Sequence, residues 1–363
     1  MSPRRVYLHV GAPKTGTTYL QDRLALNADA LRRHGYTYPT GPHEDMFLAA
    51  LDVVDRPWGG MRPLAQGEWD ALVRRTRKVR GTAVLSHEIL AGARPSGVRR
   101  VLDSLDGTEV HVVYTARDVA RQVAAEWQEQ VKHQRKLSFR TFLEQIRETD
   151  QRKATRWFWR VQGLGGVLDR WGRGLAPERF HLVTVPRPGG PAGELWRRFC
   201  AATGMDPAWA PVEGARKNPS IGTAETTLLR RVNARLKAAG LPSDQYRSLV
   251  RHAVVHQTWA NRPDMQPVTL PPEAFDWAEE IAQLWIERAL EAGVDVVGDL
   301  EELRPVRPAP DAVWQDPDRP SNRDVSSAAL DAIVALTLEA ARRPDPADPL
   351  VSRSARLSRL LRR

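Results

Sequence analysis

The chain has 363 residues, enough for one large domain or two ordinary ones, and its 42% hydrophobic residues are compatible with a buried core. Its 54 lysines and arginines against 44 acidic residues give a net charge of +10, which favours an anionic partner or serves solubility alone. Cys200 is the only cysteine, so an intramolecular disulfide and a cysteine-rich metal site are excluded. We find neither a signal peptide nor a transmembrane segment, and expect a cytoplasmic protein without a metal.

The first predicted element is a short strand that leads through a turn into a helix. Apolar residues alternate with others from residue 6 to residue 10, and Gly11 ends this run. Beyond the turn, apolar residues recur at helical spacing until Gly35: Tyr19, Leu20, Leu24 and Leu31. The turn therefore lies at a helix N-terminus, where backbone N–H groups and the helix dipole favour a phosphate or sulfate.

The turn also carries side chains that suit an anion. Gly11 and Gly16 let the backbone approach closely, and Lys14 supplies a positive charge. Hydroxyl donors come from Thr15, Thr17 and Thr18. The two glycines have the spacing of a Walker A loop, but Thr17 stands where that loop has its lysine. This departure argues against an ordinary nucleoside triphosphatase.

Further along the chain, strands alternate with helical stretches. Residues 36–39 indicate a short edge strand, and buried strands are predicted at 82–85, 109–115 and 180–185. Helical stretches are predicted between them, among them 69–79, 119–131 and 142–168. Residues 41–63 have the composition of a surface connector that could border a substrate site. This order predicts an α/β fold with a mostly parallel central sheet flanked by helices.

The last part of the chain changes in composition. Residues 304–325 are rich in proline, aspartate and arginine and are interpreted as a linker. Residues 326–363 form a predicted helical, basic tail, whose last residues either anchor to an acidic surface or remain solvated. We therefore predict an α/β domain over 1–303, a linker over 304–325 and a helical C-terminal extension over 326–363.

Three polar sites fall at predicted strand ends. They are the turn around Lys14, the triplet Ser86-His87-Glu88, and Arg117 after the strand 109–115. Ligands of parallel sheets bind beyond the carboxyl ends of the strands, so these sites are expected to meet at one edge. A solvated carboxylate at Glu88 and a structural ion pair at Arg117 are the plain alternatives.

The sequence Pro13-Lys14-Thr15-Gly16-Thr17-Thr18 after an N-terminal strand resembles the 5′-phosphosulfate loop of sulfotransferases that use 3′-phosphoadenosine 5′-phosphosulfate (PAPS). By the order of its motifs, the resemblance extends over residues 1–300. It implies a P-loop-type sulfotransferase fold, with PAPS as co-substrate and no metal. In this family the loop holds the 5′ end of PAPS, and Lys14 would stabilise the charge on the leaving phosphate oxygen.

The resemblance also implies roles for other residues. Glu88 best fits the position of the catalytic base, and His87 is the rival. Arg117 corresponds to an arginine that binds the 3′-phosphate together with a serine eight residues later, but here that position is Ala125. Arg121 or Gln122 could compensate. Arg216 and Lys217 resemble a later basic loop that closes over the 3′-phosphate, although a solvated basic turn has the same appearance.

The predicted function is therefore transfer of a sulfuryl group from PAPS to a hydroxyl or amine of a small-molecule, carbohydrate or lipid acceptor. One alternative is a nucleotide kinase or nucleoside triphosphatase. Another is a non-catalytic nucleotide-binding interaction protein on the same fold. A nucleic-acid partner is not expected, because the positive charge is dispersed and no recognised module is present.

Overall fold

A computed structural model describes residues 5–40, 46–148, 154–214, 220–309 and 311–342. Its centre is a six-stranded sheet of order β2-β3-β1-β4-β5-β6, in which every strand pairing is parallel. The strands are β1 (Arg5–Gly11), β2 (Tyr36–Thr37), β3 (Thr82–Ser86), β4 (Glu109–Ala116), β5 (Phe180–Thr184) and β6 (Asp295–Val297). Sequence analysis does not predict β6, because three residues are too few to show an alternating pattern.

The chain divides into two compact units. Unit 1 comprises Met1–Glu126, Thr141–Asn218 and Thr269–Trp314 and contains the whole sheet. Unit 2 comprises Trp127–Arg140, Pro219–Val268 and Gln315–Arg363. Helices α7 (Val119–Lys132) and α8 (Phe139–Arg147) both contain a boundary between the units.

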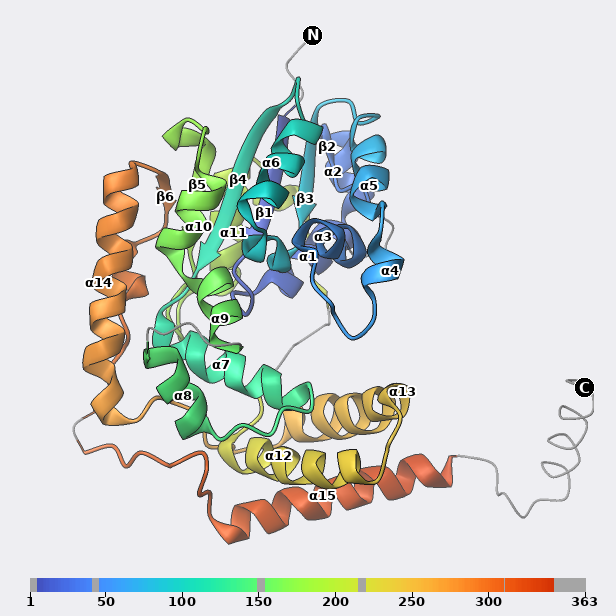
Figure 1. Ribbon diagram of the computed structural model, residues 1–363, viewed down its shortest axis with the longest axis vertical. Helices are drawn as coiled ribbons and strands as arrows, with labels where there is room; N and C mark the ends of the chain where they lie inside the picture. Colours follow the sequence, from blue (N-terminus) through green and yellow to red (C-terminus); the bar gives the residue numbers. More distant parts are fainter. Residues whose placement is uncertain (1–4, 41–45, 149–153, 215–219, 310, 343–363) are drawn as a thin grey trace, which may run out of the picture. The chain divides into compact units, whose positions relative to one another are not determined.

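Unit 1 is an α/β layer structure with helices on both sides of the sheet. On one face, the His9 ring of β1 contacts the Phe199 ring of α11 at 5.3 Å between centres. On the other face, the Tyr114 hydroxyl of β4 donates a hydrogen bond of 2.9 Å to the carbonyl of Val161 in α9. Figure 1 shows α6 and α10 on the near side of the sheet. The helical elements of unit 1 are α1 (Thr17–Leu26), α2 (Ala28–Arg33), α3 (Phe47–Val54), α4 (Arg62–Ala65), α5 (Glu68–Thr76), η1 (Glu88–Gly92), α6 (Pro95–Ser104), α9 (Ala154–Gln162), α10 (Leu164–Trp171), η2 (Pro177–Arg179), α11 (Glu194–Thr203), η3 (Pro207–Trp209), η6 (Pro272–Ala274), α14 (Phe275–Ala292) and η7 (Leu300–Leu303).

The described residues of unit 2 form helices and the segments that connect them, with no strand among them. Buried polar side chains tie its helices together: Asn233 donates to the carbonyl of Val131 at 2.7 Å and accepts from the Tyr246 hydroxyl at 2.8 Å. The indole of Trp259 donates to the carbonyl of Ala328 at 2.9 Å. Its elements are α12 (Thr223–Ala238), α13 (Ser243–Gln245), the π-helix η4 (Tyr246–Thr258), η5 (Trp259–Asn261) and α15 (Asn322–Ala341).

Two predicted elements differ in detail from the structure. The helical stretch predicted over 142–168 is divided: α8 ends at Arg147, α9 covers Ala154–Gln162, and α10 begins at Leu164. A Cβ at Gly163 would lie 2.5 Å from the carbonyl oxygen of Trp159, so this tight break suits glycine. Residues 41–63 are not only a surface connector, since α3 lies within them and buries most of its apolar residues.

The predicted fold class is confirmed: the chain is α/β, its central sheet is parallel, helices flank it, and a helix follows near the C-terminus. The domain boundaries at residues 303 and 325 stay predictions, because compactness does not test which segments fold independently. The basic residues at the end of the tail lie outside the described residues. Among the described helices, not one combines the length and apolar composition that crossing a bilayer requires.

Candidate functional site

The turn between β1 and α1 is hydrogen-bonded to the end of β4. The backbone N–H of Ala12 donates to the carbonyl of Thr115 at 2.8 Å, and the Thr115 hydroxyl lies 2.9 Å from the carbonyl of Gly11. The Thr15 hydroxyl lies 2.5 Å from both the Ala12 carbonyl and the Thr115 hydroxyl. Thr15 is 1% exposed, so it holds the turn together from inside. Its predicted contact with an anion stays a prediction, since this hydroxyl is engaged within the turn.

Two positive φ angles shape the turn. Lys14 has φ of 65° and Gly16 has φ of 85°, and only glycine adopts this region without steric cost. The hydrogen bonds of Thr15 and Thr115 hold Lys14 in this conformation. Gly16 is the N-cap of α1, where no side chain caps the helix and no acidic residue lies in the first turn. The first N–H groups of α1 therefore have no side-chain acceptor within the described chain, as an anion site requires.

The side chains of the first turn of α1 divide between core and surface. Thr17 is 3% exposed and belongs to the buried side of the helix. Thr18 is half-exposed beside it, and Lys14 is half-exposed at the tip of the turn. Lys14 and Thr18 thus have the accessibility that their predicted roles need.

Glycine at position 11 allows the turn to touch the segment after β3. A Cβ there would lie 2.8 Å from the backbone oxygen of Glu88, which leaves no room for any side chain. From α1, the Gln21 amide donates to the Glu88 carboxylate at 3.0 Å. Both the turn and the helix that follows it are therefore in direct contact with Glu88. Sequence analysis did not find the role of Gln21, which depends on this long-range contact.

The two candidate bases have different surroundings. Glu88 begins η1, and its side chain is 25% exposed. His87 is the N-cap of η1: its Nδ1 accepts the backbone N–H of Ile89 at 3.3 Å, and its ring is 7% exposed against Phe47. This bond occupies one ring nitrogen of His87. The carboxylate of Glu88 is the more accessible of the two groups.

The pKa of the Glu88 carboxyl is lowered. Burial acts to raise it, but the neighbouring His87 and the hydrogen bond from Gln21 outweigh this effect. Glu88 is therefore ionised at neutral pH, in contrast with the raised pKa that a strong general base would have. An ionised carboxylate is ready to accept a proton, although as a weak base.

Arg117 lies where β4 ends, as predicted. Its Nη2 donates to the side chain of Gln122 at 2.5 Å and to the carbonyl of Arg121 at 3.1 Å. Its Nε is buried and has no acceptor among the described residues. Burial first, and then the nearby Arg121, lower the pKa of the guanidinium to about 10, with Asp118 acting against them. Arg117 is still charged at neutral pH, and it offers a buried donor to an anion.

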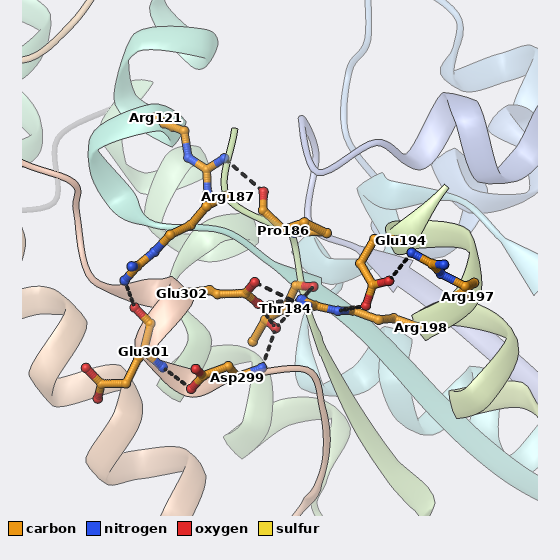
Figure 2. Close-up of polar contacts among 10 residues, drawn as sticks. All are labelled: Arg121, Thr184, Pro186, Arg187, Glu194, Arg197, Arg198, Asp299, Glu301 and Glu302. Atoms are coloured by element: carbon orange, nitrogen blue, oxygen red, sulfur yellow. Dashed lines mark hydrogen bonds and ion pairs between the residues drawn. The ribbon is translucent and has the colours of Figure 1, made fainter. Parts of the chain in front are cut away.

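Arg121 is engaged differently. Its Nε pairs with the carboxylate of Asp118, a residue that is 3% exposed, and its Nη1 donates to the carbonyl of Pro186 at 3.3 Å. Figure 2 shows the bond to Pro186. Arg121 thus joins the end of β4 to the segment after β5. The remaining two cofactor candidates, Arg216 and Lys217, lie outside the described residues.

Two buried glutamines connect Arg117 to the turn. Gln122 donates to the carbonyl of Pro13 at 3.1 Å and to the side chain of Gln162 at 2.6 Å. Gln162 also donates to the Pro13 carbonyl, at 3.0 Å. Sequence analysis considered Gln122 only as a substitute ligand and missed Gln162. Neither link has a local sequence signal, because α9 supplies one of the two glutamines from far along the chain.

A second missed group lies beneath the turn. The ring of His9 is fully buried, with Nδ1 2.7 Å from the Ser86 hydroxyl and Nε2 3.3 Å from the Thr115 hydroxyl. Burial lowers the pKa of His9 to about 4, with Glu88 acting against this. His9 is therefore neutral and links the ends of β1, β3 and β4. The alternation along β1 shows which face His9 occupies but not its partners.

Aromatic rings continue from His87 away from the turn. The Phe47 ring lies 5.6 Å from that of His87 and 6.0 Å from that of Trp58. Trp58 in turn lies 5.7 Å from Trp157, over which the guanidinium of Arg56 sits at 4.3 Å. Phe47, Trp58 and Trp157 are each half-buried. They form an aromatic row beside the candidate bases, and Phe47 and Trp58 come from the predicted substrate-bordering segment 41–63.

Comparisons with known proteins complete this description. No protein-family model matches the chain, and no curated protein matches it. A sulfotransferase from Alicyclobacillus acidocaldarius aligns with 66% of this chain and 98% of its own, at 19% identity and a TM-score of 0.42. The sulfotransferase domain from the curacin biosynthetic pathway aligns with 61% of this chain and 81% of its own, at 12% identity and a TM-score of 0.32. Since both TM-scores are below 0.5, we base no function on these likenesses.

Proposed function

We propose that this protein is a sulfotransferase that moves a sulfuryl group from PAPS to a hydroxyl or amine. One observation carries the proposal: the turn at Lys14, the uncapped N-terminus of α1 and the carboxylate of Glu88 lie together, joined by Gly11 and Gln21. An anion-binding turn and a proton acceptor in contact are the two parts that such a transfer needs.

The residues present fit the charge of PAPS. The first N–H groups of α1 suit the 5′-phosphosulfate, and Lys14 would stand beside them. Arg117 would hold the 3′-phosphate, since its buried Nε lacks an acceptor that a phosphate oxygen would provide. Gln122 and Gln162 fix the spacing of these two groups through the Pro13 carbonyl. These contacts position Arg117, but they do not supply the hydroxyl that is missing at Ala125.

PAPS supplies the sulfuryl group, and the chain supplies position and charge. Glu88 would take the proton of the acceptor hydroxyl while the acceptor oxygen bonds to sulfur. The bond from sulfur to the bridging phosphate oxygen breaks, and Lys14 would stabilise the negative charge that the oxygen gains. The products are the sulfated acceptor and 3′-phosphoadenosine 5′-phosphate, and this scheme requires no metal. Phe47 and Trp58 favour an acceptor with an apolar or ring-containing body.

Calorimetric titration with 3′-phosphoadenosine 5′-phosphate tests the donor site. We expect tighter binding of this product than of ATP with Mg²⁺. Lys14→Ala and Arg117→Ala should each weaken it by at least about tenfold, because each removes a charged contact worth about 1.5–3 kcal/mol. Lys78→Ala and Arg74→Ala change exposed residues of the same types and are the matched controls.

The outcomes separate the candidate functions. Binding of ATP with Mg²⁺ alone would overturn the proposal in favour of a nucleotide kinase or nucleoside triphosphatase. Binding of PAPS without transfer of labelled sulfate to any acceptor in a broad panel of alcohols, phenols, sugars and amines would favour a non-catalytic binding protein. Transfer that Glu88→Gln abolishes, while product binding is retained, would support both donor and base.

A further inference from the structure

Two buried histidines face each other at the end of the sheet opposite to the turn. His111 of β4 and His181 of β5 are 8% and 7% exposed, and the Nδ1 of His111 lies 2.8 Å from the Nε2 of His181. Their ring planes are inclined by 12° and the ring centres are 5.1 Å apart. Because the centres are much farther apart than the nitrogens, the rings meet edge to edge. The geometry is that of an N–H···N hydrogen bond.

A carboxylate binds the outer nitrogen of each ring. The Nε2 of His111 lies 2.7 Å from Glu109, and the Nδ1 of His181 lies 2.6 Å from Asp295 of β6. Parallel register explains the set, since Glu109 and His111 are two residues apart on β4 and His181 pairs with Asp295. The result is a continuous chain of three hydrogen bonds across three strands.

The protons in this chain can be counted. An ionised carboxylate only accepts, so the nitrogens facing Glu109 and Asp295 must both carry hydrogen. The contact between the two rings needs one hydrogen more. Two neutral imidazoles carry two N–H groups in total, whereas the three hydrogen bonds require three.

We propose that His111 and His181 hold one shared proton, as an imidazole–imidazolium pair, and that this proton fastens β6 to the sheet. With two neutral rings, either two nitrogen lone pairs would face each other at 2.8 Å or one carboxylate would lose its donor. With two charged rings, two N–H groups would point at each other. The state with one added proton satisfies every partner, and it leaves Glu109, Asp295, Arg5 and the pair with no net charge.

The groups around the pair act on its protonation in both directions. Burial, and then the neighbouring His181 and Arg5, lower the pKa of His111, whereas the hydrogen bond and the charge of Glu109 act to raise it. Arg5 of β1 also binds Glu109 at 2.8 Å. The proton count therefore follows from the hydrogen-bond geometry. Tyr7 of β1 packs on His111 at 4.9 Å between ring centres, and burial raises its pKa, so it is uncharged. Further titratable or charged residues on adjoining elements are Tyr36 of β2, Cys200 of α11, and Glu178 and Arg179 of η2.

Loss of the proton is expected to affect more than the histidine pair, because β6 connects the pair to a second hydrogen-bond network. Immediately after β6, Gly298 allows the chain to pass Thr184, where a Cβ would lie 2.1 Å from the hydroxyl. The Thr184 hydroxyl then accepts the N–H of Asp299 at 3.1 Å and donates to Glu302 at 2.6 Å. Glu302 also pairs with Arg198, which is largely buried. Figure 2 shows this network, with Arg187 bound to the carbonyl of Glu301.

The three residues of β6 each pair with a residue of β5, and the two networks lie at its two ends. Loss of the shared proton leaves one of the three hydrogen bonds without its hydrogen. The side chain of Asp295 is 45% exposed, so water can replace its donor, and the bond at this first residue of β6 is the one most readily given up. We therefore expect residues 294–303 to open more often as the pH rises and the proton is lost. The protonated pair thus stabilises β6 at the edge of the sheet in a pH-dependent way. This inference does not depend on the proposed function.

Nuclear magnetic resonance of the full chain with ¹⁵N-labelled histidine tests the proton count. At pH 7 we expect three protonated nitrogens and one acceptor nitrogen from the two rings, identified by loss of their signals in His111→Asn and His181→Asn. Two protonated nitrogens, one on each ring, would overturn the proposal. Four would overturn it too.

Hydrogen–deuterium exchange of residues 294–303, measured as protection factors between pH 6 and pH 10, tests the fastening. The protection factors should fall at least about tenfold when the proton is lost. A tenfold change is what a pKa difference of about one unit between the closed and the open state produces. Asp295→Asn keeps an acceptor but removes the negative charge, so the fall should begin about one pH unit lower. The control Asp29→Asn removes an exposed carboxylate paired with Arg32 and should leave the pH dependence of the protection factors unchanged. Identical pH profiles in wild type and Asp295→Asn would refute the fastening.

Discussion

The hydrogen bond from Gln21 to Glu88 gives a sharp test of the proposed base. Gln21→Leu removes the donor, which lies 3.0 Å from the carboxylate, while keeping the size of the side chain. This bond stabilises the ionised form and is one of the causes that lower the pKa of Glu88. Its removal raises that pKa, so the base is protonated at a higher pH than in the wild type. The acid limb of kcat/KM, where activity is lost as the pH falls, must therefore move to higher pH.

The size of the shift follows from the exposure of the group. A hydrogen bond to a charged group contributes about 1.5–3 kcal/mol when buried. The side chain of Glu88 is 25% exposed, and water replaces part of what Gln21 provides. We therefore expect about 1 kcal/mol, which moves the acid limb by about half to one pH unit. Above this limb the activity should be close to that of the wild type, because the carboxylate remains in place.

The assay is sulfuryl transfer from labelled PAPS, with kcat/KM measured between pH 4 and pH 9. Gln257→Leu is a matched control, since Gln257 is exposed and its amide contacts only His252 among the described residues. An acid limb that stays in place in Gln21→Leu would show that Glu88 is not the group that titrates. A limb that moves to lower pH would contradict the sign of the argument.

Three further predictions concern the same part of the molecule. Gly11→Ala should abolish transfer and lower stability by about 2 kcal/mol or more in urea unfolding, because φ at this position is 125° and the new Cβ meets the backbone of Glu88. Trp58→Ala should raise the acceptor KM severalfold but leave binding of 3′-phosphoadenosine 5′-phosphate unchanged in calorimetry. The unfolded chain binds a proton at His9 near pH 6.5, whereas the folded chain binds it only near pH 4. The free energy of unfolding should therefore decrease by about 3 kcal/mol as the pH falls from 6.5 to 4. In His9→Asn this decrease should be absent.

The elements predicted well are those whose pattern is local. The strand, turn and helix at residues 6–31 have alternation, two glycines and helical spacing within one short segment, and β1 and α1 lie there. The edge strand β2 was also predicted, from four residues. In contrast, Gly163 interrupts an otherwise helical pattern because of a contact with Trp159, which no local propensity describes. β6 is held by pairing with β5, and its own sequence carries little signal.

The candidate site divides in the same way. Lys14, Glu88 and Arg117 were predicted because each follows a strand, and the carboxyl ends of parallel strands share one edge of the sheet. Gln21 and Gln162 could not be predicted, since glutamine on a helix is most often a surface residue and their partners are distant in sequence. The difference is physical: strand order fixes which segments meet, but buried amide contacts depend on how helices pack on the sheet.

One face of β1 runs from the histidine pair to the turn. Its residues Arg5, Tyr7 and His9 lie on the same side, about 7 Å apart in steps of two. Tyr7 packs on both histidines and Arg5 binds Glu109, whereas His9 lies under the turn. A charged His9 would repel the shared proton across this short distance in a buried layer. Its burial keeps it neutral, so β1 places no further charge between the histidine pair at one end and the proposed anion-binding turn at the other.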